Sequence, residues 1–243
     1  MPPIAVLLDL DDTLLTSNTA RFVQAYLKRL SKALRPFAPP DVLVDLILRA
    51  TRAIQLNEDP AVTNRQAFER VFLPGLDGSP ADVTATLAHF YRHEYPALRR
   101  YVSPRPEAPL VVRHLLQAGH RVVLATNPIF PRTAIEQRMQ WAGVHAFPYA
   151  LVTAMENMHA CKPNPRYYRE ILATIACPPE RALMVGDDPA NDIAPAREVG
   201  LKTWWIAPEE ASLPPALSAD FHGSLAEFLD WVQDGGLPRL FGE

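Results

Sequence analysis

The 243-residue chain is poor in the features that mark disulfide-bonded, membrane-spanning and nucleic-acid-binding proteins. Its two cysteines, Cys161 and Cys177, are too few for a disulfide framework. The net charge of -3 and the lack of a basic run argue against a protein that binds nucleic acid by neutralising phosphates. No stretch approaches the roughly 18–20 apolar residues that a membrane-spanning helix needs. The N-terminus also lacks the basic residues of a signal peptide. We therefore expect a cytoplasmic protein that binds neither nucleic acid nor a membrane.

The order of apolar and polar residues divides the chain into two regions. Residues 17–99 contain apolar residues at helical spacing and no convincing strand, so we expect an all-helical domain there. Around it, 1–16 and 100–243 are expected to form one α/β domain. Its expected strands are 4–9, 120–127, 149–153, 181–188 and 201–207, and its expected helices are 109–118, 132–143, 164–176, 190–200 and 224–233. Such alternation predicts a doubly wound, mostly parallel sheet with a helical domain inserted after the first strand.

Three acids follow the first expected strand, in the sequence AVLLDLDDTLL at residues 5–15. Asp9 and Asp11 are two residues apart, which places their side chains on the same side of an extended chain. Two adjacent carboxylates need a cation or a shared proton. Mg²⁺, which prefers oxygen ligands, meets that need. The alternative is local, because Asp12 and Thr13 are residues that commonly begin a helix.

Polar residues also follow the other strands, where ligands bind in doubly wound sheets. They are Thr126 and Asn127 after the second strand, Asp187, Asp188 and Asp192 after the fourth, and Lys162 in the loop between. Phosphoryl transfer through an aspartyl-phosphate requires such a set. It uses a carboxylate nucleophile, a metal ion, a hydrogen-bond donor, a cation and a further acid.

The segments DLDDTLL, LATN, KPNP and GDDPANDI resemble, in order and spacing, the four motifs of the haloacid dehalogenase (HAD) superfamily. The resemblance covers residues 4–14 and 105–206. It implies a Rossmann-like core, a helical cap of the C1 type at 17–99, and Mg²⁺ as cofactor. Superfamily members with a second acid at the position of Asp11 are mostly phosphatases and other phosphoryl-transfer enzymes, whereas the true dehalogenases lack that acid.

The resemblance also implies a role for each residue of the first motif. Asp9 would be the nucleophile and a metal ligand. Asp11 would donate a proton to the leaving oxygen, accept one from the hydrolytic water, and bind the metal through its backbone carbonyl. Asp12 is expected to cap the local turn, and Thr13 to hydrogen-bond backbone near the nucleophile.

The other motifs supply the remaining expected roles. Thr126 and Asn127 would hold the transferring phosphoryl group. Lys162 would pair with Asp9 and the phosphoryl oxygens. Asp187 would bind the metal directly. Asp188 and Asp192 would bind it through water or support its ligands. The alternative for one of these three acids is that it only caps the following helix, and the sequence leaves open which one.

The leading hypothesis is an Mg²⁺-dependent phosphatase for a small phosphorylated metabolite, such as a sugar phosphate, phosphoglycolate or a nucleotide. One alternative is a non-catalytic protein that binds phosphate or a partner at the same site, although retention of both Asp9 and Asp11 favours an enzyme. Another is a phosphomutase or phosphonate hydrolase. Phosphonate hydrolysis needs a cap lysine, and the helical region offers only Lys28 and Lys32. Arg65 is one of several scattered arginines that could contact an anionic substrate.

Overall fold

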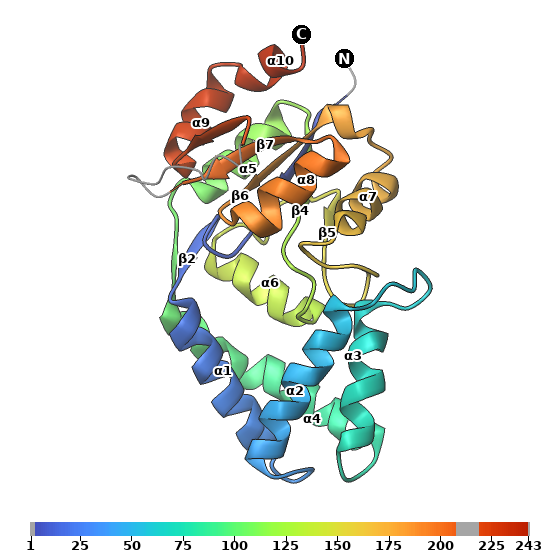
Figure 1. Ribbon diagram of the computed structural model, residues 1–243. Coiled ribbons are helices and arrows are strands. Elements are labelled where there is room, and N and C mark those ends of the chain that lie inside the picture. The colour runs from blue at the N-terminus through green and yellow to red at the C-terminus, as the bar shows by residue number, and fades with distance from the viewer. Residues whose placement is uncertain (1–2, 208–218, 243) are drawn as a thin grey trace.

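The computed structural model describes residues 3–207 and 219–242, and its centre is a six-stranded parallel sheet (Figure 1). The strand order β5-β4-β1-β6-β7-β8 confirms the expected doubly wound α/β fold. The strands are β1 (Ala5–Leu8), β4 (Arg121–Leu124), β5 (Leu151–Val152), β6 (Ala182–Gly186), β7 (Lys202–Ile206) and β8 (Phe221–Gly223). The edge strand β8 was not expected, because three residues are too few to show an alternating pattern.

Helices cover both faces of the sheet, as Figure 1 shows. Alternate residues of each central strand point to opposite faces. In β1, Val6 and Leu8 belong to a core cluster with residues of α5, α6 and α9, whereas Ala5 and Leu7 join a second cluster with α7 and α8. The helices of this domain are α5 (Ala108–Gln117), α6 (Arg132–Trp141), α7 (Pro165–Thr174), α8 (Ala194–Val199), α9 (Leu225–Gln233) and α10 (Gly236–Leu240). The apolar strands are therefore buried on both sides, as parallel sheets require.

A block of helices lies beyond one edge of this α/β layer, and we call it the helical block (18–101). It contains α1 (Thr19–Ala33), α2 (Pro40–Gln55), α3 (Asn64–Phe72), α4 (Pro80–His93) and short 3₁₀ turns at Leu73–Gly75 and Tyr95–Tyr101. Asn18, Thr63 and Ser79 cap α1, α3 and α4 by accepting backbone N–H groups. The block has an apolar cluster of its own, which also includes Trp141 of α6.

The helical block is joined to the α/β domain on two sides. On one side, β2 (Leu15–Ser17) pairs antiparallel with β3 (Val102–Pro104), so the chain leaves and returns along one short ribbon. On the other, the buried Asn64 donates through Nδ2 to the carbonyls of Pro128 (3.3 Å) and Ala160 (3.0 Å). The block is thus held at the loops that follow β4 and precede α7.

Among the described residues, none of the helices combines the length and apolarity that crossing a membrane would demand.

Candidate active site

Sheet pairing brings the predicted residues to one edge of the sheet. Beyond β1, the N–H of Asp9 donates to the carbonyl of Val185 (2.9 Å), and the N–H of Ala125 donates to that of Leu8 (2.7 Å). The pairing of β1 with β4 and β6 therefore continues for one residue past the ends of the strands. Asp9, Thr126 and Asp187 lie at or just beyond this point, at the carboxyl edge where such sheets bind ligands.

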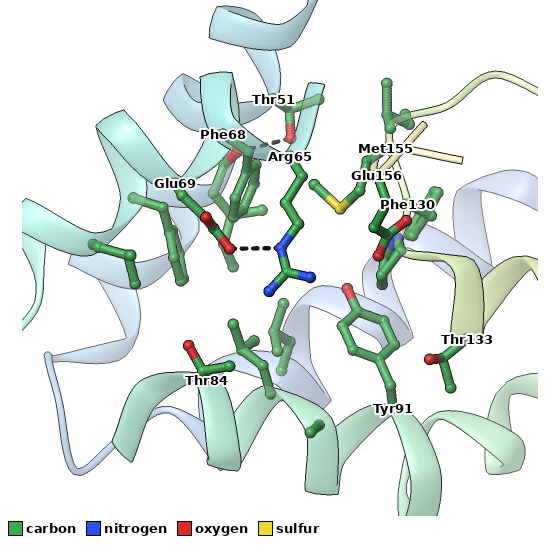
Figure 2. A pocket seen from close by; sticks show the side chains of 18 of the residues that line it. Thr51, Arg65, Phe68, Glu69, Thr84, Tyr91, Phe130, Thr133, Met155 and Glu156 are labelled. Carbon is green, nitrogen blue, oxygen red and sulfur yellow. Dashed lines mark hydrogen bonds and ion pairs between the residues drawn. The ribbon is translucent and has the colours of Figure 1, made fainter. Parts of the chain in front are cut away.

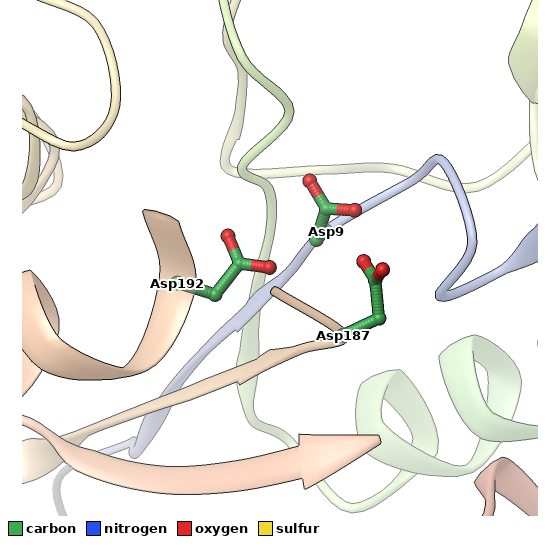
Figure 3. Close-up of side chains that lie close together, drawn as sticks. All are labelled: Asp9, Asp187 and Asp192. Carbon is green, nitrogen blue, oxygen red and sulfur yellow. The ribbon is translucent and has the colours of Figure 1, made fainter. Parts of the chain in front are cut away.

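Three carboxylates converge at this edge, as Figure 3 shows. Asp9, Asp187 and Asp192 each offer an oxygen, and these oxygens lie within 4.8 Å of one another. Burial, with the nearby charges of Asp9 and Asp192, raises the pKa of Asp187 to about 8. Burial also raises the pKa of Asp192. Carboxylates held this close need a proton or a cation, and their hard oxygen donors fit Mg²⁺.

Lys162 supplies a buried positive charge beside these acids. Its Nζ donates to Asp9 Oδ1 at 2.7 Å and to Asp192 Oδ1 at 2.6 Å, and the residue is 3% exposed. Burial lowers the pKa of Lys162, but the carboxylates of Asp192 and Asp9 outweigh it and hold this pKa well above its usual value. When all three carboxylates are ionised, the single ammonium group leaves two negative charges uncompensated, which a divalent cation could neutralise.

The sequence left open the roles of Asp188 and Asp192, and the structure separates them. Asp188 caps the turn after β6, since its Oδ1 accepts from the N–H groups of Ala190 (2.9 Å) and Asn191 (3.1 Å). Asp192 is buried and faces Lys162 and the acid cluster. The two residues are four positions apart in a tight turn. The side chain of Asp188 therefore points to the N–H groups of the turn, and that of Asp192 points to Lys162.

Asp12 and Thr13 shape the turn that follows Asp9. Asp12 adopts a left-handed backbone conformation (φ 61°), and its carboxylate accepts from Ser17 N at 2.6 Å and Ser17 Oγ at 3.0 Å. The expected bond from Thr13 to backbone is wrong: its hydroxyl donates to Asp187 Oδ1 at 3.3 Å. The turn directs Thr13 toward the end of β6, where Trp205 Nε1 also holds the Asp187 carbonyl at 2.7 Å.

Thr126 and Asn127 follow β4. The buried carbonyl of Thr126 accepts from the hydroxyls of Thr153 (2.7 Å) and Tyr167 (2.9 Å), which fixes the backbone at this point. Asn127 Oδ1 is buried and has no hydrogen-bond partner within 3–207 and 219–242. A fixed loop with an unsatisfied polar atom is a feature of ligand-binding edges.

Asp11 has a partner that the sequence analysis missed. Nη1 of Arg138, on α6, forms an ion pair with Asp11 Oδ2. The partial burial of Asp11 raises its pKa, and the charge of Arg138 opposes that rise. Arg138 is 4% exposed, whereas most arginines lie at the surface, and nothing in the α6 sequence marks it as different.

A cavity of about 210 Å³ lies between the helical block and the loops after β4 and β5 (Figure 2). Its wall includes Tyr91, Phe130 and other apolar groups. The Arg65 guanidinium extends into it, and Arg65 Nε pairs with Glu69 Oε1 at 2.8 Å. Of the scattered arginines, Arg65 thus lies in the wall of this cavity, together with the acids Glu69 and Glu156.

The structure does not favour a catalytic role for the thiol of Cys161. Cys161 is buried beside Lys162, and burial raises the pKa of its thiol to about 11. A nucleophilic cysteine needs its thiolate form, which such a pKa suppresses.

The fold and this carboxylate–lysine edge define a hydrolase of the HAD type. The haloacid dehalogenase-like hydrolase family matches residues 5–200, and the chain belongs to that family. A phosphoglycolate phosphatase from Rhodospirillum rubrum is 30% identical over 96% of this chain and 94% of its own length. A phosphoserine phosphatase from Thermus thermophilus is 30% identical over 61% of this chain, and the match spans only 59% of that protein.

Solved structures share the fold. A HAD phosphatase from Thermococcus onnurineus aligns with a TM-score of 0.58 at 21% identity, over 94% of this chain and 97% of that one. A 2-haloacid dehalogenase from Pseudomonas syringae aligns with a TM-score of 0.62 at 18% identity, over 96% and 99%. At these identities the likeness describes the architecture alone.

Proposed function

We propose that the protein is an Mg²⁺-dependent phosphatase that hydrolyses a small phosphomonoester through an aspartyl-phosphate on Asp9. The observation that carries the proposal is the arrangement around this one carboxylate. Asp9 is buried, paired with Lys162 at 2.7 Å, and grouped with Asp187 and Asp192. The named phosphatases among its relatives support the same reaction class.

The residues divide the reaction between them. Asp9 attacks phosphorus in line with the leaving oxygen, and Lys162 offsets the charge that gathers on the phosphoryl oxygens. Thr126 and Asn127 hold that group from the end of β4. Asp11 gives its proton to the leaving oxygen and later takes one from the water that cleaves the aspartyl-phosphate.

The metal site in this proposal is formed by Asp9, Asp187 and the backbone carbonyl of Asp11, with Asp192 beside them. Mg²⁺ bound there would neutralise the acids and the phosphate dianion, which allows two negative groups to approach each other. The close carboxylate oxygens and the raised pKa of Asp187 support this assignment.

We further propose that the helical block acts as a cap that selects the leaving group, which makes 17–99 and the rest of the chain two functional domains. The cavity at the join, with Arg65 extending into it, supports this role. The β2–β3 ribbon is the expected hinge, because both chain connections pass through it. Lys28 and Lys32 are exposed on α1, a position that does not favour a Schiff base for phosphonate hydrolysis.

The direct test is hydrolysis of p-nitrophenyl phosphate with Mg²⁺ by the wild type and the Asp9→Asn variant. Asparagine keeps the shape of the side chain but cannot form the aspartyl-phosphate, so kcat should fall by at least about a thousandfold. Asp188→Asn is the matched control, since Asp188 caps a turn and should keep most of the activity. Full activity in Asp9→Asn would refute the mechanism. A panel containing phosphoglycolate, phosphoserine, sugar phosphates and nucleotides then identifies the substrate class.

A further inference from the structure

Arg138 is a buried cation that the proposed mechanism does not use. The residue is 4% exposed, and its Nη1 pairs with Asp11 Oδ2. The guanidinium carbon lies 4.6 Å from the centre of the Phe130 ring, in cation–π contact. Nε and Nη2 are also buried and lack a hydrogen-bond partner within the described ranges. Burial of a charge with unsatisfied donors is costly, so the arrangement calls for an explanation beyond packing.

We propose that Arg138 is a positioning residue for Asp11, an inference that rests on the proposed phosphatase reaction. Arg138 holds Oδ2 of the carboxylate and leaves Oδ1 to carry the proton that goes to the leaving oxygen. The Asp11 side chain is 35% exposed, so without a partner it would sample several rotamers at the mouth of the site. Arg138 is itself fixed, because α6 and the Phe130 ring bury it.

The contacts of Arg138 connect Asp11 to the wall of the cavity under the helical block. Phe130 lines the cavity under the helical block, and its ring centre is 5.3 Å from that of Tyr26, another wall residue. Arg138 packs on the same ring. The Phe130 ring thus faces the cavity and also contacts the guanidinium that pairs with Asp11. Under this proposal, Arg138 holds the Asp11 carboxyl on the side of the site that faces this aromatic wall.

A purely structural reading explains the pair less well. A buried ion pair adds little net stability compared with apolar residues of similar size, so stability alone does not account for an arginine here. Its ion-pair partner is Asp11, the residue that moves a proton in the proposed reaction. The guanidinium's planar fork can fix the orientation of a carboxylate in a way that a flexible ammonium cannot.

The test compares two substrates that differ in their need for a proton. p-Nitrophenolate leaves without protonation, whereas an alkoxide does not, so only alkyl esters depend strongly on the general acid. The second substrate is the alkyl phosphomonoester that the wild type hydrolyses fastest. The readout is kcat/KM, because it covers the steps up to departure of the leaving group and is independent of later hydrolysis of the aspartyl-phosphate.

We expect Arg138→Met to lower kcat/KM for the alkyl ester about 100-fold, and for p-nitrophenyl phosphate less than about fivefold. Arg138→Lys should restore part of the loss, since it returns a charge without the fork. Arg132→Met is the matched control on the same helix: Arg132 pairs with Glu136 and is 44% exposed, so both substrates should be unaffected.

A second measurement guards against a folding defect. In an Asp11→Asn background, Arg138→Met should cause no further loss with the alkyl ester, because Arg138 acts through Asp11. The double variant removes both charges and so leaves none stranded in the interior. An equal loss with both substrates in Arg138→Met, or a further 100-fold loss in the double variant, overturns the inference. A wild type that hydrolyses neither ester instead refutes the phosphatase function itself.

Discussion

Mg²⁺ should stabilise the folded protein, and the size of the effect should depend on pH because protons compete for Asp187. In the metal-free protein, burial and the neighbouring acids raise the pKa of Asp187 to about 8. A carboxyl whose pKa is raised on folding contributes stability below its unfolded pKa and loses it as the pH rises through the folded value. The melting temperature in EDTA should therefore fall between about pH 4 and pH 8.

The magnitude follows from linkage. At pH 8.5, with Mg²⁺ at about 100 times its dissociation constant, binding stabilises the fold by about 2.7 kcal/mol. For a chain of this size that raises Tm by about 5–11 °C. At pH 6, about two units below the pKa of Asp187, a proton must first be displaced, and the apparent affinity falls about 100-fold. The same Mg²⁺ concentration then contributes only about 0.4 kcal/mol, and the shift in Tm nearly vanishes.

The assay is thermal unfolding followed by circular dichroism, at pH 6 and pH 8.5, with EDTA or with millimolar Mg²⁺. Asp187→Asn should lose the Mg²⁺ response at both pH values, because an amide is a poor replacement for an anionic ligand. Asp188→Asn should keep the response, because asparagine retains the side-chain oxygen that caps the turn. An equal Mg²⁺ shift at pH 6 and pH 8.5, or a full response in Asp187→Asn, would refute the reasoning.

Two further substitutions test the lysine and the cavity. Lys162→Met should abolish phosphatase activity and lower the free energy of unfolding by about 3–5 kcal/mol, because it leaves the buried Asp9 and Asp192 without their cation. Urea titrations with EDTA measure this loss, and an unchanged urea midpoint would contradict it. Arg65→Met should flatten the rates across the substrate panel by raising KM at least about tenfold for anionic leaving groups while sparing p-nitrophenyl phosphate. If the order of rates across the panel is unchanged in Arg65→Met, Arg65 does not determine substrate selectivity.

The sheet could be foreseen from sequence because its determinants are local. Apolar strands alternate with amphipathic helices, and polar residues follow β1, β4 and β6, so order and periodicity suffice to place these three strands. The strand β8 could not be foreseen, since its three residues, Phe221–Gly223, depend on pairing with β7 for their conformation. Local patterns carry no information about such long-range pairing.

In the candidate site, too, some residues can be recognised from the local sequence, whereas others depend on tertiary packing. Asp9 and Asp187 were recognisable because they follow strands, and position at the sheet edge is a property of the local sequence. Arg138 was not, because its burial results from the packing of α6 between the sheet and the helical block. The different roles of Asp188 and Asp192 likewise follow from the path of one turn, which the pattern GDDPANDI does not specify.

The hydrogen bonds of Asn64 set a free-energy cost for detaching the helical block from the α/β domain. Its side chain bonds the carbonyls of Pro128 and Ala160, next to the loops that carry Asn127 and Lys162. Rotation of the block about the β2–β3 ribbon must break these bonds, at a cost of about 0.5–1.5 kcal/mol each. The same bonds hold the two loops in place. Under the proposed cap motion, opening of the block and loosening of the two loops would therefore be coupled. A ligand that orders the loops would then also favour the closed block.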